Sequence, residues 1–204
     1  MPRAFSADER ETIESQIRAA GREQFERVGL RKTTVSDLAR AAGVAKGSFY
    51  LFYASKEALL SSILQEEETA LRREVQEQMA RPYRSARDRF AHFLRLHFQS
   101  LDAHPLLRTL RDPGELEALS RHLPPDALEQ AQANDDAFFM QFISQWQRDG
   151  AVRAYSEEAM EGLGRALRAL SLHRDLIGES RFAALSDLLV ESLAEALCPD
   201  ARGH

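Results

Sequence analysis

The residues with the most readable chemistry lie between positions 45 and 56, where small, cationic and hydroxyl-bearing side chains alternate. The set comprises Ala45, Lys46, Gly47, Ser48, Tyr50, Tyr53 and Lys56. The small side chains let a groove or a phosphate backbone come close, the ammonium groups reach a guanine edge or a phosphate, and the tyrosine hydroxyls can donate to phosphate oxygens. The pattern predicts contact with nucleic acid. The alternative is a glycine-hinged helical corner without a ligand.

Two short helices joined by a tight turn would position these side chains. Thr33 and Thr34 can cap the first helix, because a hydroxyl accepts an unpaired amide of the first turn. Its apolar face recurs at three and four residues and comprises Val35, Leu38, Ala39 and Ala42. Gly43 ends this helix, since glycine tolerates the left-handed conformation, and a second helix is predicted over residues 45–53. A short helix pair with a glycine turn is the helix-turn-helix pattern.

This stretch resembles the N-terminal signature of the TetR family of transcriptional regulators, over roughly residues 9–69. The matching positions are Phe25, Gly29, Thr33, Thr34, Val35, Leu38, Ala39, Ala42, Gly43, Val44, Lys46, Gly47, Ser48, Phe49, Tyr50, Phe52, Tyr53, Ser55, Lys56, Glu57 and Leu59. Two positions depart from the family pattern. Ala45 replaces a frequent Ser or Thr and removes a hydroxyl contact, and Tyr53 replaces the commoner Phe.

The resemblance implies a DNA-binding domain over 9–69, with its helix-turn-helix at about 33–53, and a ligand-binding and dimerisation domain over 70–204. The candidate DNA-binding residues are Thr33, Thr34, Ala45, Lys46, Gly47, Ser48, Tyr50, Tyr53 and Lys56. It also implies a homodimeric repressor that binds a palindromic operator in double-stranded DNA. A small molecule would release it by binding the released form more tightly.

Composition agrees with a local DNA-reading end on an acidic protein. The chain of 204 residues has a net charge of -5, yet residues 1–60 carry ten Lys or Arg against eight Asp or Glu. No apolar run approaches the roughly 18 residues that span a bilayer, so no membrane partner is expected. Cys198 is the single cysteine, which excludes an internal disulfide and agrees with a cytoplasmic location.

Helical periodicity continues to the end of the chain and predicts an all-α fold of about nine helices, with a three-helix N-terminal domain and a C-terminal bundle. Beyond the first helix at 8–28 and the helix-turn-helix, helical segments are predicted over 55–80, 85–104, 105–111, 115–121, 126–149, 156–174 and 180–197. The last two could complete the monomer core or pair with a second copy as a four-helix bundle. The family resemblance implies the second arrangement.

Aromatic residues recur along two of these helices and could line a cavity for a small apolar or aromatic effector. The candidates are Phe90, Phe93, His97, Phe98, Phe138, Phe142 and Trp146. An aromatic stripe at this spacing is more often simply core.

Two other functions deserve comparison with the regulator. In a small helical enzyme, His97 would be the general base, although a satisfied core histidine is the more ordinary interpretation. No phosphate loop, nucleophile elbow or metal-binding spacing is present, and no cofactor is expected. A helical scaffold that binds protein is the third possibility, and the salt dependence of DNA binding separates it from a regulator.

Overall fold

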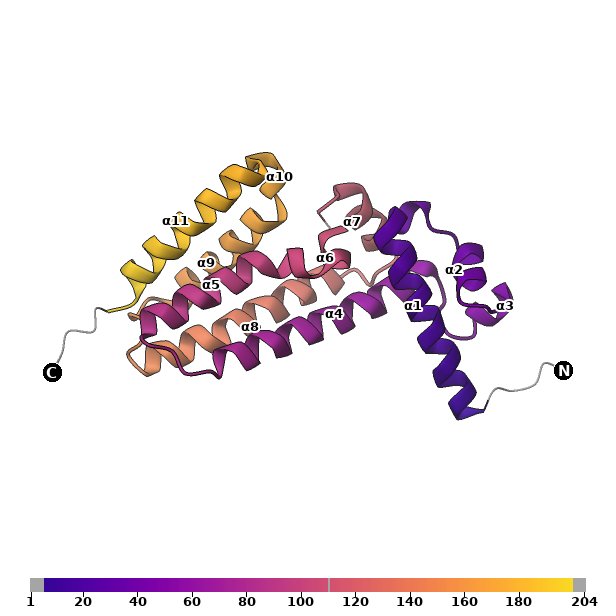
Figure 1. Ribbon diagram of the computed structural model, residues 1–204, viewed down its shortest axis with the longest axis horizontal. Helices are drawn as coiled ribbons and strands as arrows, with labels where there is room; N and C mark the ends of the chain where they lie inside the picture. The colour runs from indigo at the N-terminus through magenta and orange to yellow at the C-terminus, as the bar shows by residue number, and fades with distance from the viewer. Residues whose placement is uncertain (1–5, 110, 200–204) are drawn as a thin grey trace. The chain divides into compact units, whose positions relative to one another are not determined.

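The computed structural model describes residues 6–109 and 111–199, which form eleven helices and no strand (Figure 1). The predicted all-α fold is confirmed. The helices are α1 (Ala7–Lys32), α2 (Val35–Ala41), α3 (Lys46–Phe49), α4 (Lys56–Met79), α5 (Ala86–Ala103), α6 (Pro105–Thr109), α7 (Pro113–Ser120), α8 (Ala127–Arg148), α9 (Glu157–Leu172), α10 (Arg174–Ile177) and α11 (Glu179–Leu197). Within the described residues, no helix is both long and apolar enough to cross a bilayer.

The chain divides into two compact units. The first contains the residues up to Thr69 together with His104–Pro125, and the second contains Ala70–Ala103 and the residues from Asp126 onward. The predicted division into 9–69 and 70–204 therefore stays a prediction. The structure adds a feature that no sequence pattern indicated, because α6 and α7 pack with the first unit and contact α1.

The first unit is built around a close contact between α1 and the start of α4. Gly21 allows it, since a Cβ there would lie 2.8 Å from Cδ2 of Leu59 and 3.0 Å from Cδ1 of Ile63. The fully buried side chains of this unit are Ile17, Phe25, Leu30, Leu38, Phe49, Leu59, Ile63 and Leu106. α1 begins with a capping box, in which Ser6 accepts the amide of Glu9 and the Glu9 carboxylate accepts the amide of Ser6.

Three local predictions differ from the structure. α1 does not end at Gly29 but kinks there, with φ 78° and ψ 172°, and makes a further turn to Lys32. α3 ends at Phe49 rather than at residue 53, because the amides of Leu51 and Phe52 turn back to Ser48 and Phe49, three residues earlier. The predicted helix at 156–174 ends at Leu172, and a separate short helix, α10, follows it.

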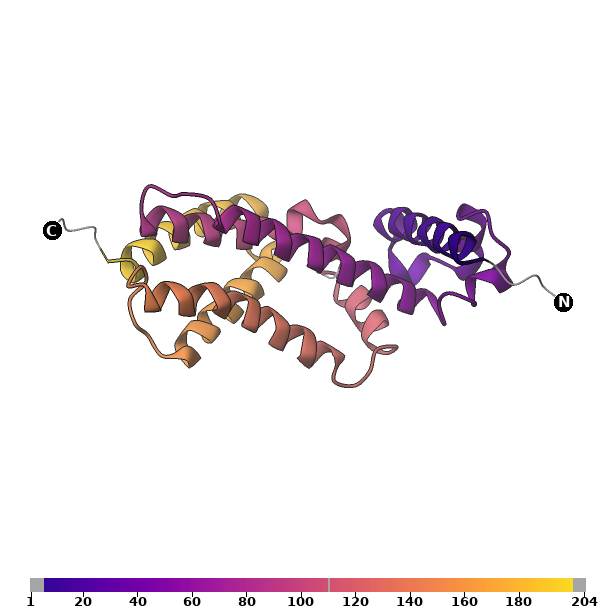
Figure 2. The ribbon, with the colours of Figure 1, turned by 90° about the horizontal axis from the view of Figure 1, so that it is seen from below.

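The second unit packs α5 against α11 and α9, and α8 against α9 (Figures 1 and 2). Its interior is rich in aromatic and aliphatic side chains, among which Phe90, Leu94 and Ile143 are fully buried. The carboxylate of Asp136 is buried on α8 and accepts from Arg165 at 2.9 Å and from Arg168 at 3.2 Å. A buried carboxylate is tolerated only when it is paired, so these contacts tie α8 to α9.

Candidate nucleic-acid interface

Local capping fixes the start of the helix-turn-helix. Thr34 is the N-cap of α2, and its hydroxyl oxygen accepts the amide of Asp37 at 3.2 Å. The same hydroxyl donates to the Asp37 carboxylate at 2.6 Å, which lowers the pKa of Asp37. The predicted threonine cap is therefore present at Thr34, as the sequence indicated.

The turn between α2 and α3 depends on a left-handed glycine. Gly43 has φ +69°, and the amide of Val44 donates back to the carbonyl of Ala39 at 2.9 Å. A side chain at Gly43 would be strained by this backbone conformation even though the space around it is open. The turn thus sets the direction in which α3 leaves α2.

α3 presents one face to solvent and one to the core. Phe49 is fully buried and anchors the helix, whereas Ala45, Lys46 and Gly47 are exposed. Tyr50 follows at 50% exposure and meets the Phe49 ring edge to face at 5.6 Å. These are the side chains that the sequence nominated for a groove.

Gly47 is a glycine that packing within the chain does not explain. A Cβ at Gly47 would meet no atom of the chain within 4 Å, and its φ is not in the left-handed region. The fold itself therefore does not require glycine here. A residue without a side chain at an exposed helix start suits a surface that a partner backbone must reach closely.

Three of the nominated residues form hydrogen bonds inside the unit, and their assignment as DNA contacts stays a prediction. Thr33 is buried at 1% exposure and its hydroxyl donates to the carbonyl of Gly29 at 2.7 Å. The Lys56 ammonium donates to the carbonyls of Leu30 and Thr33 at 2.7 and 2.8 Å. These bonds stabilise the connection from α1 to α2.

Tyr53 is the third, and its hydroxyl joins a charged network between α1 and α4. The Arg18 guanidinium donates to the Tyr53 hydroxyl at 2.7 Å, and that hydroxyl donates to Glu14 at 3.2 Å. Arg18 also pairs with Glu66 on α4. Burial raises the pKa of Tyr53, so the hydroxyl stays protonated and holds the segment between α3 and α4 to α1.

The sequence missed one exposed residue beside this face. Leu51 lies 58% exposed next to Tyr50. Helical periodicity had extended α3 to residue 53, and an apolar residue in a helix is ordinarily read as core. Leu51 lies at the surface, where an apolar side chain can contact a sugar or a thymine methyl.

The residues nominated for an effector cavity lie in the second unit and largely contact one another. Phe93 has ring-centroid distances of 5.1 Å to Phe142, 5.3 Å to Trp146 and 5.4 Å to Phe139. The Phe90 ring meets Trp146 at 6.2 Å, and the Phe138 ring meets Phe142 at 5.4 Å. Their role as cavity walls stays a prediction.

His97 lies among the same rings, 6.0 Å from Phe98 and 6.3 Å from Phe139. Burial, reinforced by the charge of Arg168, lowers its pKa to about 4, so the ring is neutral at pH 7. No cluster of three His, Cys, Asp or Glu side chains suited to a metal ion occurs among the described residues.

These features define the class of protein: a helical chain with a helix-turn-helix unit that presents α3 to solvent. Residues 17–63 match the family model of bacterial regulatory proteins, tetR family. A 35-residue segment is 49% identical to the uncharacterized HTH-type transcriptional regulator YvdT of Bacillus subtilis strain 168, covering 17% of this chain and 18% of that protein. Residues 17–63 therefore carry the N-terminal pattern of the tetR family, and the predicted resemblance to that family is confirmed over these residues.

Solved structures extend the similarity to the whole fold. A TetR-family regulator from Pectobacterium atrosepticum superposes with a TM-score of 0.70 at 19% identity, over 93% of this chain and 97% of that one. The fatty acid degradation regulator FadR from Bacillus halodurans superposes with a TM-score of 0.62 at 20% identity, over 99% of this chain and 100% of that one. FadR from Bacillus subtilis, solved with stearoyl-CoA, superposes with a TM-score of 0.62 at 20% identity, over 88% of this chain and 97% of that one. The matched family and these relatives are transcriptional regulators, not enzymes.

Proposed function

We propose that this chain is a ligand-responsive transcriptional repressor that binds a palindromic operator as a homodimer. The observation that carries the proposal is the solvent-facing side of α3, within a domain that matches the TetR family model. Lys46, Gly47 and Tyr50 are exposed there, while Phe49 holds the helix from below. A helix that is buried on one side and polar on the other can enter a major groove with its polar side. Because its target is chromosomal DNA, we place the protein in the cytoplasm.

The roles of the nominated residues then divide in two. We assign contact with DNA to Thr34, Ala45, Lys46, Gly47, Ser48 and Tyr50. Thr33, Tyr53 and Lys56 instead hold the reading helices in place through the bonds described above. Loss of the second group would weaken DNA binding through the shape of the domain.

We propose that the dimer forms through α9 and α11. The exposed residues of α9 include the small series Ala159, Gly162, Ala166 and Ala169. On α11, Ala184 and Ser192 are exposed on either side of Leu188, which is itself 61% exposed. Small residues allow helices to approach closely, and an exposed leucine among them is better covered. Two-fold pairing of these faces requires two related half-sites in the operator.

We propose a small apolar or aromatic effector, held by the aromatic interior of the second unit. The support is the ring cluster around Phe93, which offers apolar surface with few polar groups. Bacillus subtilis FadR, with a similar fold, has been solved with stearoyl-CoA. Residues 56–69 of α4 belong to the first unit and residues 70–79 to the second, so this helix connects the two covalently.

Gel-shift binding to the DNA flanking the gene for this protein tests the proposal. We expect a specific complex sized for a dimer, whose affinity falls steeply with salt as counterions are released. Lys46→Ala and Tyr50→Ala should each weaken the specific complex about tenfold, which corresponds to about 1.4 kcal/mol. If the operator lies elsewhere in the genome, selection of bound fragments from genomic DNA should identify it.

Arg73→Ala is the matched control, because Arg73 is a 76% exposed cation on the part of α4 in the second unit. It should leave operator affinity unchanged. Leu188→Glu should give a monomer by sedimentation and abolish the dimer-sized complex. Full operator affinity in both α3 variants, or a dimer that survives Leu188→Glu, would contradict the corresponding part of the proposal.

A further inference from the structure

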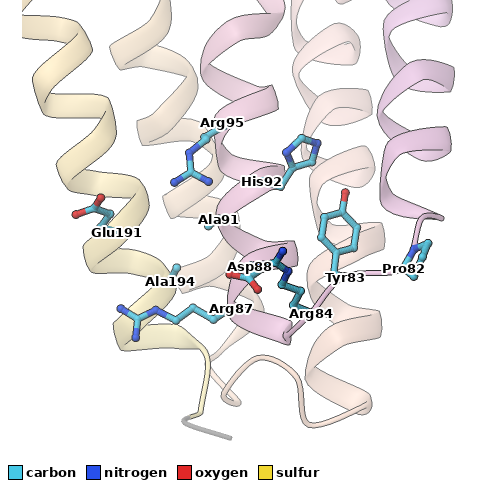
Figure 3. Close-up of a pocket in the computed structure, with 10 residues that line it drawn as sticks. All are labelled: Pro82, Tyr83, Arg84, Arg87, Asp88, Ala91, His92, Arg95, Glu191 and Ala194. Atoms are coloured by element: carbon cyan, nitrogen blue, oxygen red, sulfur yellow. The ribbon is translucent and has the colours of Figure 1, made fainter.

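An open pocket of about 470 Å³ lies in the second unit and shares no residue with the candidate DNA-binding and effector-binding sets (Figure 3). It is formed by the connection from α4 to α5, the first half of α5, and α11. Its lining residues are Pro82, Tyr83, Arg84, Arg87, Asp88, Ala91, His92, Arg95, Glu191 and Ala194. None of the seven residues nominated for an effector cavity is among them.

The pocket is cationic on a chain that is acidic overall. Three arginines line it against two carboxylates, whereas the whole chain has a net charge of -5. In Figure 3, Arg87 and Arg95 extend from α5 toward α11, while His92 and Tyr83 lie on the other side of α5. The guanidinium groups of Arg87 and Arg95 therefore lie on the α11 side of the recess, and the two rings lie on the opposite side.

Most of this positive charge is not neutralised by the protein. Neither Arg84 nor Arg95 forms an ion pair or a side-chain hydrogen bond with any residue that the structure describes. Among the described residues, Arg87 pairs with Glu195 alone, at 3.3 Å, and both side chains of that pair are solvated. Exposed pairs of this kind contribute little, so Arg87 remains available to a ligand.

The arginines also occupy positions that folding does not favour. Arg84 and Arg87 flank the first residue of α5, where the helix dipole favours anions and disfavours cations. Local choices that oppose stability are expected at functional sites. An anion in the pocket would offset this repulsion, and the pocket with its arginines supplies the place and the donors for it.

The walls indicate what the rest of the ligand resembles. The Tyr83 and His92 rings lie 5.7 Å apart, and the Tyr83 hydroxyl is engaged by the carbonyl of Gln78 at 3.0 Å. Together with Pro82, Ala91 and Ala194 they give the recess an apolar side. We propose that this pocket binds a small organic anion, in which a phosphate or carboxylate group meets the arginines and an apolar body meets the rings.

This inference does not depend on DNA binding, so the two proposals fail separately. The test is calorimetric titration of the full chain with phenyl phosphate, with inorganic phosphate and phenol as partial probes at matched ionic strength. We expect saturable binding of phenyl phosphate, weaker binding of inorganic phosphate, and none of phenol.

Two variants move the affinity in opposite directions. Arg84→Gln combined with Arg95→Gln should raise the Kd of phenyl phosphate at least tenfold, while Glu191→Gln should lower it two- to threefold by removing a carboxylate from the rim. Arg73→Gln combined with Arg148→Gln is the matched control, because it removes two cations outside the pocket. The control should keep the Kd of the natural chain. All these side chains are exposed, so each variant should fold.

A second readout comes from His92, whose pKa is lowered by burial and by the charges of Arg95 and Arg81. Bound phenyl phosphate should raise that pKa in an NMR titration, with His92→Gln identifying the signal, and should not raise it in the double arginine variant. Absence of saturable binding, or equal binding in the double variant and its control, would overturn the proposal.

Discussion

The carboxylate of Glu115 holds the end of α1 from a helix far along the chain, and removing it gives a sharp test of this contact. Gly29 breaks α1 with φ 78°, so the amides that follow it start a new turn. The Leu30 amide donates to the Glu115 carboxylate at 2.6 Å and the Arg31 amide donates at 3.3 Å. Leu30 is buried, at 1% exposure, so no water replaces this acceptor easily.

The expected magnitude follows from these two bonds. A hydrogen bond to a charged group contributes about 1.5–3 kcal/mol, and an unsatisfied buried amide costs about 1–3 kcal/mol. Because Glu115 is half-buried and Arg31 is exposed, we expect Glu115→Ala to destabilise this region by about 1–2 kcal/mol. Glu115→Gln keeps an acceptor without the charge and should cost about half as much.

Amide hydrogen exchange of the full chain measures the effect where it acts. The Leu30 amide should exchange about 5–30 times faster in Glu115→Ala, since that factor corresponds to the expected loss. Glu117→Ala is the matched control on the same helix, because Glu117 is exposed and its carboxylate accepts from Arg121 of the next turn, at 2.5 Å. An unchanged Leu30 exchange rate in Glu115→Ala, or an equal change in Glu117→Ala, would refute this reasoning.

Two further predictions concern the second unit. His97 has a pKa of about 4 in the folded chain and an ordinary value near 6.5 when unfolded. The stability that the neutral ring gives the folded chain is therefore complete above about pH 6.5 and is lost as the pH falls toward 4. The natural chain should lose up to about 3 kcal/mol of unfolding free energy over this pH range, and His97→Gln should not show that loss, as measured by urea unfolding. Parallel pH profiles for the two chains would exclude this role of His97. Gly164→Ala should lower unfolding stability by about 1–3 kcal/mol, because the new Cβ would lie 2.9 Å from Cδ1 of the buried Phe139. An unchanged free energy of unfolding in Gly164→Ala would count against the steric explanation.

Much of the helix-turn-helix was predictable because its signals are local. The Thr34 cap, the left-handed Gly43 and the buried Phe49 each act within a few residues of their own position. Short-range hydrogen bonds and backbone sterics decide such features, and the sequence states them directly. The exposed Lys46 and Tyr50 then follow from helical spacing.

The direction of long polar side chains was not predictable in the same way. Tyr53 and Lys56 carry the groups that suit phosphate contact, yet both reach partners that the chain brings together only on folding. Arg18 lies 35 residues before Tyr53 and the Leu30 carbonyl lies 26 residues before Lys56. No periodicity encodes such a pairing, because the acceptor belongs to another helix.

The sequence by itself determined the all-helical class, the resemblance of residues 17–63 to the tetR family and the helix-turn-helix geometry, since caps, turns and apolar spacing are properties of neighbouring residues. Only the tertiary structure decided that α6 and α7 join that unit, that Glu115 serves amides 84 and 85 residues away, and that arginines of α5 share a pocket with α11. These contacts depend on how helices cross, and crossing is settled by side-chain packing across the whole chain rather than by any local pattern.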